Sequence, residues 1–265
     1  ESAGNDGTTK ALLAEYFGRN AEELKRLRAV PDSNVRVRRV HSFKDGGSYD
    51  GQWLKGQRDG EGCQLWPDGA EYVGGWRKNR AEGKGRFKHT NGDVYHGEWR
   101  RNVAVGRGVF NHNDGLSYVG EFEDYVQGGY GVEVGPDGSV FQGEFAKGKK
   151  HGHGTYCWSD GSMYVGQWHE NLIDGLGQYT GADGHSFSGR WQRSMMHGCG
   201  CSTWADGRVY SGQYVRDQKH GFGVFVWADG KRYEGFWCGG LQHGFGRLHI
   251  GSKVKLAEFA SGQTV

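Results

Sequence analysis

Proline, net charge and long apolar runs are what this sequence has least of. Only 3 of its 265 residues are proline, and its glycines follow no strict Gly-X-Y triplet, which excludes a collagen helix. The 33 basic and 31 acidic residues give a formal charge of +2, so no global field favours nucleic acid or a membrane. No run of about 18 apolar residues occurs, so the sequence predicts no transmembrane helix.

Cysteine is also scarce, odd in number and irregularly spaced, which is typical of reduced thiols rather than of a disulfide framework. The first residues lack the apolar stretch of a signal peptide. We therefore expect a cytoplasmic protein, with association with the cytoskeleton or a membrane as an alternative. The sequence begins at Glu1, for which reason we expect it to be trimmed from a longer chain. The five cysteines are Cys63, Cys157, Cys199, Cys201 and Cys238.

Glycine and aromatic residues, in contrast, are abundant. Glycine accounts for 50 residues and aromatics for 14% of the chain, where about 7% glycine is usual. So many rings give ample apolar surface to bury, which argues against disorder. The excess is periodic, because an aromatic-x-Gly-x-aromatic unit recurs every 23 residues without insertion. The units start at Tyr49, Tyr72, Tyr95, Tyr118, Phe141, Tyr164, Phe187, Tyr210 and Tyr233.

A Gly-x-Gly pair follows each unit, and an Asp-Gly or Asn-Gly step precedes it. Alternate side chains of a strand share a face, so we expect the rings to lie flat over bare glycine backbone, where glycine is otherwise costly. The Asp-Gly steps predict tight hairpin turns with positive φ. A second turn follows the closing aromatic and carries Gly, Asn or Asp. Tyr125 and Ser194 depart from this pattern, so their turns are expected to differ.

The period predicts an all-β fold, an elongated single-sheet antiparallel β-hairpin solenoid with two strands per repeat, each repeat contacting only its neighbours. Residues 1–34 are predicted to form a short helical cap and linker, divided near Gly18, with Asn20 and Glu23 resembling a capping box. A half repeat and nine full repeats occupy 35–250. Residues 251–265 are predicted to hold a capping strand, in which Phe259 closes a degraded tenth motif.

Tyr-x-Gly-x-Trp followed by Gly-x-Gly at this spacing, over residues 45–250, resembles the MORN repeat (membrane occupation and recognition nexus). The resemblance implies a twisted antiparallel sheet with a groove lined by the repeat aromatics. It also implies a non-catalytic scaffold that links proteins to membranes or the cytoskeleton, dimerises, or binds partner helices. Phosphoinositide binding has been proposed for the family. Some members precede a lipid-kinase or methyltransferase domain, so a regulatory region of a larger enzyme is an alternative.

Two sets of residues are predicted to contact a protein partner, expected to be a helix or peptide segment; a second copy of the chain, giving a homodimer, is the alternative partner. The first set is the aromatic groove: Tyr95, Trp99, Tyr118, Phe122, Tyr164, Trp168, Phe187, Trp191, Tyr210, Tyr233 and Trp237. The second consists of loop positions that turn apolar, as protein contacts often do: Val103, Val105, Leu172, Ile173, Met195, Met196 and Leu241.

A basic segment near the N-terminus is the strongest electrostatic feature. Its members are predicted to contact anionic lipid, each contributing about 1 kcal/mol near a charged surface. Ordinary solvated surface charge is the alternative interpretation. The segment comprises Arg26, Arg28, Arg36, Arg38 and Arg39.

No catalytic, metal or cofactor site is predicted. The Gly-x-Gly pairs lack the Lys-Ser/Thr and the helix of a phosphate loop. Histidines recur before Gly-x-Gly, but successive copies lie about 9.6 Å apart across two strands, whereas Zn–N bonds are about 2.0–2.1 Å. A zinc site shared across a dimer, with Cys199 or Cys201, is the remaining alternative. The histidines are His151, His197, His220 and His243.

Overall fold

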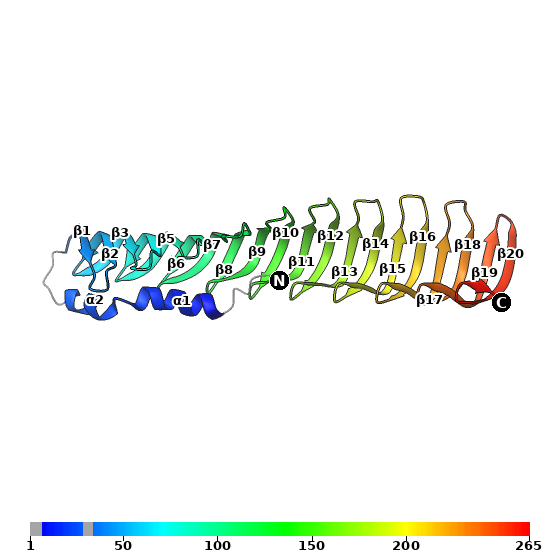
Figure 1. Cartoon of the computed structure of the whole chain (residues 1–265), viewed down its shortest axis with the longest axis horizontal. Helices are drawn as coiled ribbons and strands as arrows, with labels where there is room; N and C mark the ends of the chain where they lie inside the picture. Colours follow the sequence, from blue (N-terminus) through cyan, green and yellow to red (C-terminus); the bar gives the residue numbers. More distant parts are fainter. Residues whose placement is uncertain (1–6, 29–33) are drawn as a thin grey trace. The chain divides into compact units, whose positions relative to one another are not determined.

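The computed structural model describes residues 7–28 and 34–265, with side chains from Leu13 onward. Two helices, α1 (Gly7–Gly18) and α2 (Ala21–Arg28), come first and are followed by strands to the end of the chain. Figure 1 shows both helices running beside the first strands of the sheet. No helix among the described residues is long and apolar enough to cross a bilayer.

The strands alternate between a shorter and a longer member, and each such pair is one repeat. Their bounds are β1 (Val37–Ser42), β2 (Ser48–Leu54), β3 (Gln57–Leu65), β4 (Glu71–Arg77), β5 (Arg80–Lys88), β6 (Val94–Arg100), β7 (Val103–Asn111), β8 (Ser117–Glu123), β9 (Val126–Val134), β10 (Val140–Ala146), β11 (Lys149–Cys157), β12 (Met163–His169), β13 (Leu172–Thr180), β14 (Ser186–Gln192), β15 (Met195–Thr203), β16 (Val209–Val215), β17 (Gln218–Val226), β18 (Arg232–Cys238), β19 (Leu241–Ile250), β20 (Lys253–Ala260) and β21 (Gln263–Thr264).

The described strands belong to one antiparallel sheet of 21 strands, which confirms the predicted all-β hairpin-repeat fold with a short helical cap. The chain divides into two compact units. Unit 1 runs to Pro136 and includes Glu144–Lys149, whereas unit 2 comprises Asp137–Gly143 and Lys150–Val265. Within unit 1, β1 to β9 pair in chain order, and within unit 2, β11 to β21 do the same. This division lies inside the predicted 35–250 array and leaves the boundaries at 34 and 250 as predictions.

The Asp-Gly step closes one end of each repeat with a tight turn. In the Trp66–Ala70 turn, Trp66 N–H donates to Ala70 O at 2.9 Å, and Asp68 Oδ1 accepts from Ala70 N–H at 3.2 Å. Gly69 has a φ of +91°, which an L side chain rarely adopts. The glycine of each Asp-Gly or Asn-Gly step that precedes an aromatic unit has positive φ, so this prediction is confirmed.

The second turn of each repeat has positive φ at two successive residues, as in Lys78 and Asn79 at +49° and +66°. The expectation that Tyr125 and Ser194 form different turns is wrong, because their φ angles are +71° and +63°. Their side chains provide the anchoring that offsets the left-handed strain. The Tyr125 hydroxyl donates to the backbone oxygen of Asn102, and Ser194 Oγ accepts from the Ile173 N–H at 3.2 Å.

The two glycines of Gly-x-Gly have different roles. A Cβ at Gly85 would overlap the Tyr72 ring, so this glycine provides the bare backbone that the ring requires. Gly83, by contrast, has open space around it but a φ of +78°. It lies opposite a register shift between Gly74 and Trp76, where a β-bulge needs the unusual backbone angle. The sequence pattern had indicated only the first of these requirements.

The core of each unit is a row of rings in edge-to-face contact. The Tyr72 centroid lies 5.0 Å from Trp76 in its own repeat and 5.1 Å from Trp99 in the next. The Trp99 indole N–H donates to Gly85 O at 3.0 Å. Unit 2 ends the row with Phe259, 7% exposed and 5.2 Å from Tyr233, which confirms Phe259 as the last closing aromatic.

The N-terminal helices end and begin at Gly18 and Ala21, so the predicted break near Gly18 is confirmed. Glu23 does not form the expected capping box with Asn20. Its carboxylate accepts from Lys44 N–H at 3.1 Å and pairs with the His41 ring at 3.0 Å. The Lys44 amide, with His41, lowers the pKa of Glu23. Glu23 therefore ties α2 to the first hairpin instead of closing its own helix.

Candidate functional site

The predicted groove rings lie on one face of the sheet, and the structure buries them in the sheet's own core. All eleven are between 0 and 8% exposed, because each ring is covered by the rings before and after it. Burial raises the pKa of the Tyr164 hydroxyl to about 12, so it stays protonated and donates to Gln167 O at 3.1 Å. A partner can reach only the edges of these rings and the side chains around them.

In unit 1 this face is occupied by α1 (Figure 1). Phe17 is 7% exposed, and its ring lies 5.6 Å from both Tyr72 and Trp99. Tyr16 packs beside it, 5.2 Å from Trp66, whose indole N–H donates to Tyr16 O at 2.9 Å. Adjacent rings at the end of one helix therefore fill the groove of unit 1.

Polar and aliphatic contacts secure the helices at both ends of this packing. Arg19 pairs with Asp68 at 2.8 Å, which raises the pKa of the Arg19 guanidinium. Leu13 on α1 and Leu24 on α2 are 7% and 3% exposed. The helical cap is thus docked on the sheet rather than a loose extension.

The depth of the groove is set by the residue paired across the strands with each closing aromatic, which we call the floor residue. Beneath Phe17 in unit 1 the floor residues are Ala81 and Ala104, opposite Trp76 and Trp99, and their small side chains leave space for this ring. The other floor residues of unit 1, Arg58 and Gln127, lie opposite Trp53 and Phe122 and are larger. In unit 2 the floor residues are all larger than Ala81 and Ala104. They are Ile173, Met196, Lys219 and Gln242.

Unit 2 has an uncovered hollow of about 500 Å³ on this face. It is lined in part by three predicted groove rings, Trp168, Phe187 and Trp191, and by the floor residues Ile173 and Met196. Four further ring side chains also line it, which the predicted groove did not include: Tyr156, Trp158, Tyr179 and His185. The recurrence of tryptophan at the Trp66 position was the signal that could have identified Trp158.

Because no described helix covers the groove of unit 2, its aromatic side chains are more exposed than those at the same repeat positions in unit 1. Trp66 and Phe87 in unit 1 are 2% and 3% exposed beneath α1. Trp158 and Tyr179 hold the same repeat positions in unit 2 and are only half-buried. Unit 2 therefore offers to solvent the apolar surface that unit 1 has covered with its own helix.

Two lysines of unit 2 lie against aromatic rings of the groove face, and of these Lys150 lines the hollow, as Asp217 also does. Lys219 Nζ lies 4.8 Å from the centroid of Phe225 and 5.2 Å from that of Trp204. Burial among these rings lowers the pKa of Lys219, and no described carboxylate pairs with it. Lys150 Nζ lies 5.4 Å from the Phe141 centroid. Both ammonium groups are favourably placed on aromatic faces.

The residues predicted as apolar loop contacts lie on strands rather than on loops, at or near the starts of β7, β13, β15 and β19, and they separate into two groups. Leu172 and Leu241 are exposed by 41% and 51%, and Val103, Val105 and Met195 are half-buried. Ile173 and Met196, however, face the groove and line its hollow. Consecutive strand residues point to opposite faces, which explains why Met195 and Met196 have different surroundings.

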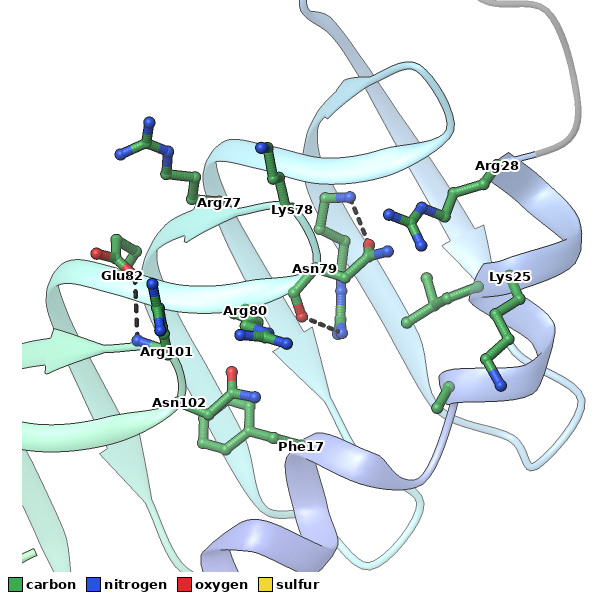
Figure 2. A pocket seen from close by; sticks show the side chains of 13 residues that line it. Phe17, Lys25, Arg28, Arg77, Lys78, Asn79, Arg80, Glu82, Arg101 and Asn102 are labelled. Carbon is green, nitrogen blue, oxygen red and sulfur yellow. Dashed lines mark hydrogen bonds between the residues drawn. The ribbon is translucent and has the colours of Figure 1, made fainter. Parts of the chain in front are cut away.

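The predicted lipid-binding arginines are not gathered into one surface. Arg36 pairs with Asp59 at 2.8 Å, Arg38 pairs with Asp50 at 3.1 Å, and the Arg39 guanidinium lies 4.4 Å from the Trp53 ring. Arg26 is exposed on α2. Arg28 lines the hollow beside α2 that Figure 2 shows.

The histidine and cysteine side chains that the structure describes do not gather into a metal site. Within residues 7–28 and 34–265, no three His, Cys, Asp or Glu side chains are grouped to hold a metal ion. All five cysteines are free thiols, and burial raises the pKa of Cys63.

Solved structures similar to this chain share little sequence with it. The TCP10 domain of Danio rerio CPAP is 12% identical, with a TM-score of 0.43 over 74% of this chain and 92% of that one. The SAS-4 (dCPAP) TCP domain of Drosophila melanogaster, in complex with a proline-rich motif of Ana2, is 9% identical, with a TM-score of 0.33 over 86% and 93%. No curated protein sequence matches significantly.

The comparison with family models is decisive. The MORN repeat model matches nine consecutive segments, and six of them are uninterrupted copies of the 23-residue period from Tyr49 to Ser186. The matched residues are 49–71, 72–94, 95–117, 118–140, 141–163, 164–186, 187–207, 210–232 and 233–252. The chain belongs to the MORN repeat family.

Proposed function

We propose that this chain is a protein-interaction scaffold whose unit 2 groove binds an amphipathic helix of a protein partner. The observation that supports it most strongly is the docking of α1, whose Tyr16 and Phe17 rings fill the groove on the same face of unit 1. Unit 2 repeats the sheet geometry but leaves a hollow of about 500 Å³. Laying the apolar face of a helix into such a groove is a common mode of peptide recognition.

The floor residues define the partner's chemistry. Ile173 and Met196 are apolar and larger than Ala81 and Ala104, so the partner's central anchors should be shorter than Phe17, as leucine and methionine are. Lys150 and Lys219 favour acidic residues at the two ends. They are six strands apart, about 29 Å at about 4.8 Å per strand, a span that a helix of roughly 19 residues covers.

A carboxylate in the groove floor should weaken this interaction strongly. Helical peptides selected from a displayed library on the full chain should carry acidic termini. Their affinity should fall by about 30-fold or more for Met196→Glu, because an interface hot spot contributes roughly 2 kcal/mol or more. Calorimetry of the selected peptides measures the change.

Met195→Glu is the matched control for this experiment. Met195 precedes Met196 on β15 but lines a different hollow, with Arg193 and Arg216. It should leave peptide affinity within about threefold of the parent chain, as is usual for surface positions away from the contact. Peptides that bind Met196→Glu as tightly as the parent would show that the groove is not their site.

A second candidate function, self-association, is favoured by an exposed aromatic cluster in unit 2. Phe222, Phe236 and Phe245 are 53%, 53% and 72% exposed on the face opposite the buried rings. The Phe222 and Phe236 rings contact each other at 5.8 Å. Contiguous exposed aromatic surface of this kind usually marks an interface.

Polar substitution of this cluster should convert a dimer to a monomer. We expect sedimentation equilibrium of the unaltered chain to show a dimer, and the double variant Phe222→Ser/Phe236→Ser to show a monomer with an unchanged fold. Val165→Ser is the control, since Val165 is 45% exposed on the same face of β12. A mass that is monomeric for the unaltered chain at every concentration would exclude this second function.

A further inference from the structure

A strongly basic hollow of about 760 Å³ lies between the N-terminal helices and the turns that follow β4 and β6 (Figure 2). Seven of its thirteen lining residues are lysine or arginine, and Glu82 is the sole acidic one. The volume is in the range of small-molecule sites. The basic residues are Lys25, Arg28, Arg58, Arg77, Lys78, Arg80 and Arg101.

Most of these cations lack a counter-charge. Glu82 accepts from the backbone N–H of Arg101 at 3.0 Å, and the nearby Asp59 pairs with Arg36 at 2.8 Å. In the part of the chain that the structure describes, no carboxylate forms an ion pair with the side chains of Arg77, Lys78, Arg80 or Arg101. The hollow therefore has a concentrated positive potential.

Arg58 adds a buried charge beneath this surface. Its side chain is 2% exposed, donates to Gln64 Oε1 at 2.7 Å and to Asn79 O at 3.0 Å, and has a buried Nε without a partner. Its guanidinium lies 4.1 Å from the Trp76 ring. A buried cation without a carboxylate is costly, and an anion bound in the hollow would reduce that cost.

The turns hold two of the cations in a fixed arrangement. Lys78 and Arg101 occupy the same position in successive repeats, with φ of +49° and +51°. The following residues, Asn79 and Asn102, anchor these turns by accepting the N–H groups of Arg58 at 2.8 Å and Ala81 at 2.7 Å. Successive repeats are about 9.6 Å apart, a separation that suits several phosphates on one small ring better than a single phosphate.

The lining also indicates what the ligand lacks. Phe17 is the only aromatic lining residue, and it is 7% exposed because it is packed into the groove. It offers no face on which a nucleobase could stack. Guanidinium groups bind phosphate through paired hydrogen bonds. We propose that this hollow binds a compact ligand with several phosphate groups, of the inositol polyphosphate class, and that the ligand holds α2 against the repeats.

The basic side chains of the hollow belong to α2 on one side and to the sheet and its turns on the other. Figure 2 shows Arg28 reaching from α2 toward the turn that carries Asn79, while Arg80 approaches from the start of β5 and Arg101 from the turn after β6. The end of α2 already contacts the sheet closely, because a Cβ at Gly56 would overlap the Leu27 carbonyl. A ligand that contacts both α2 and the sheet binds only the state in which α2 is docked. Its binding therefore stabilises docking.

Calorimetry with inositol hexakisphosphate and the full chain tests the site. We expect binding that weakens with salt, and an affinity roughly 100-fold lower for Lys78→Glu/Arg101→Glu, since each charge-assisted contact accounts for about a factor of ten. The variant should fold, because Asp124 and Glu170 hold this same turn position with φ of +52° and +47°.

The matched control is Arg193→Glu/Arg216→Glu, which makes the same charge change at the same turn position in unit 2, with φ of +49° at both residues. Its affinity should stay within about threefold of the parent. Equal losses in both double variants would mean long-range attraction rather than a site. An absence of binding by the unaltered chain at low salt would overturn the proposal outright.

Two further measurements distinguish the ligand's source and test the helix contact. Pocket-dependent recruitment to vesicles containing phosphatidylinositol 4,5-bisphosphate identifies a lipid headgroup, whereas binding of the soluble phosphate without recruitment identifies a free ligand. Either result supports the site. Bound ligand should slow amide exchange in residues 21–28, and unchanged exchange there would contradict the bridging of α2.

Discussion

Replacing Tyr164 by alanine is expected to destabilise unit 2 by about 3–5 kcal/mol, the range for truncating a large buried ring. Tyr164 is 0% exposed, and its ring lies 5.5 Å from Trp168 and 5.6 Å from Trp191. Its removal breaks the row of rings between consecutive repeats and uncovers the backbone of Gly177. Urea denaturation followed by tryptophan fluorescence measures the change in the free energy of unfolding.

Tyr164→Phe separates packing from hydrogen bonding. It loses only the donation to Gln167 O at 3.1 Å, so it should cost about 0.5–1.5 kcal/mol. Phe141 and Phe187 already hold this position in other repeats and are 1% and 0% exposed. A loss for Tyr164→Ala no greater than that for Tyr164→Phe would show that the ring row does not hold the sheet together.

The reciprocal change, Gly177→Ala, should be destabilising for the same reason. A Cβ at this glycine would overlap the Tyr164 hydroxyl, and overpacking typically costs about 1–3 kcal/mol. Combining it with Tyr164→Ala should cost less than the two changes taken separately, because the clash requires both partners.

Phe17→Ala is expected to release the N-terminal helices from unit 1. Phe17 contacts Tyr72, Trp76 and Trp99, so truncation should weaken docking by about 3–5 kcal/mol. Amide exchange in residues 7–28 should accelerate by roughly 100-fold or more, because a tenfold change corresponds to about 1.4 kcal/mol. Hydrogen–deuterium exchange with mass spectrometry measures it.

Glu15→Ala provides the control for helix release. Its side chain is 63% exposed and forms an i,i+4 pair with Arg19, a contact that contributes about 0.3–0.5 kcal/mol. Exchange should change little in this variant. If Phe17→Ala also left exchange in α2 unchanged, the helices would be held by contacts other than the aromatic groove, and the analogy between α1 and a partner helix would fail.

Helix release should also be visible in the basic hollow. Lys25 and Arg28 reach the hollow only while α2 is docked, and Arg58, Lys78 and Arg101 remain on the sheet in either case. Phe17→Ala should therefore weaken inositol hexakisphosphate binding although it removes no charge. The groove and the hollow are coupled through one helical segment, whose position both sites depend on.

Local rules were sufficient for much of the fold. The glycine at Gly69 and the ring at Tyr72 are required by turn angle and by strand alternation, and both requirements act within a few residues. For the same reason Phe259 could be placed as the last closing aromatic despite a deleted residue. Where local preference was weak, as at Tyr125 and Ser194, the turns still formed, because their side chains found hydrogen-bond partners in the preceding repeat.

The sequence alone determined the repeat, the antiparallel pairing and the rings that form the core, because each depends on contacts between neighbouring strands at a constant spacing. Only the tertiary structure decided where that aromatic face is open. Tyr16 meets Trp66 across 50 residues of chain, and no periodicity specifies such a contact. The helix docks on unit 1 because the small side chains of Ala81 and Ala104 leave the volume that Phe17 fills. In unit 2 the larger side chains of Ile173 and Met196 make the groove shallower, and it is uncovered.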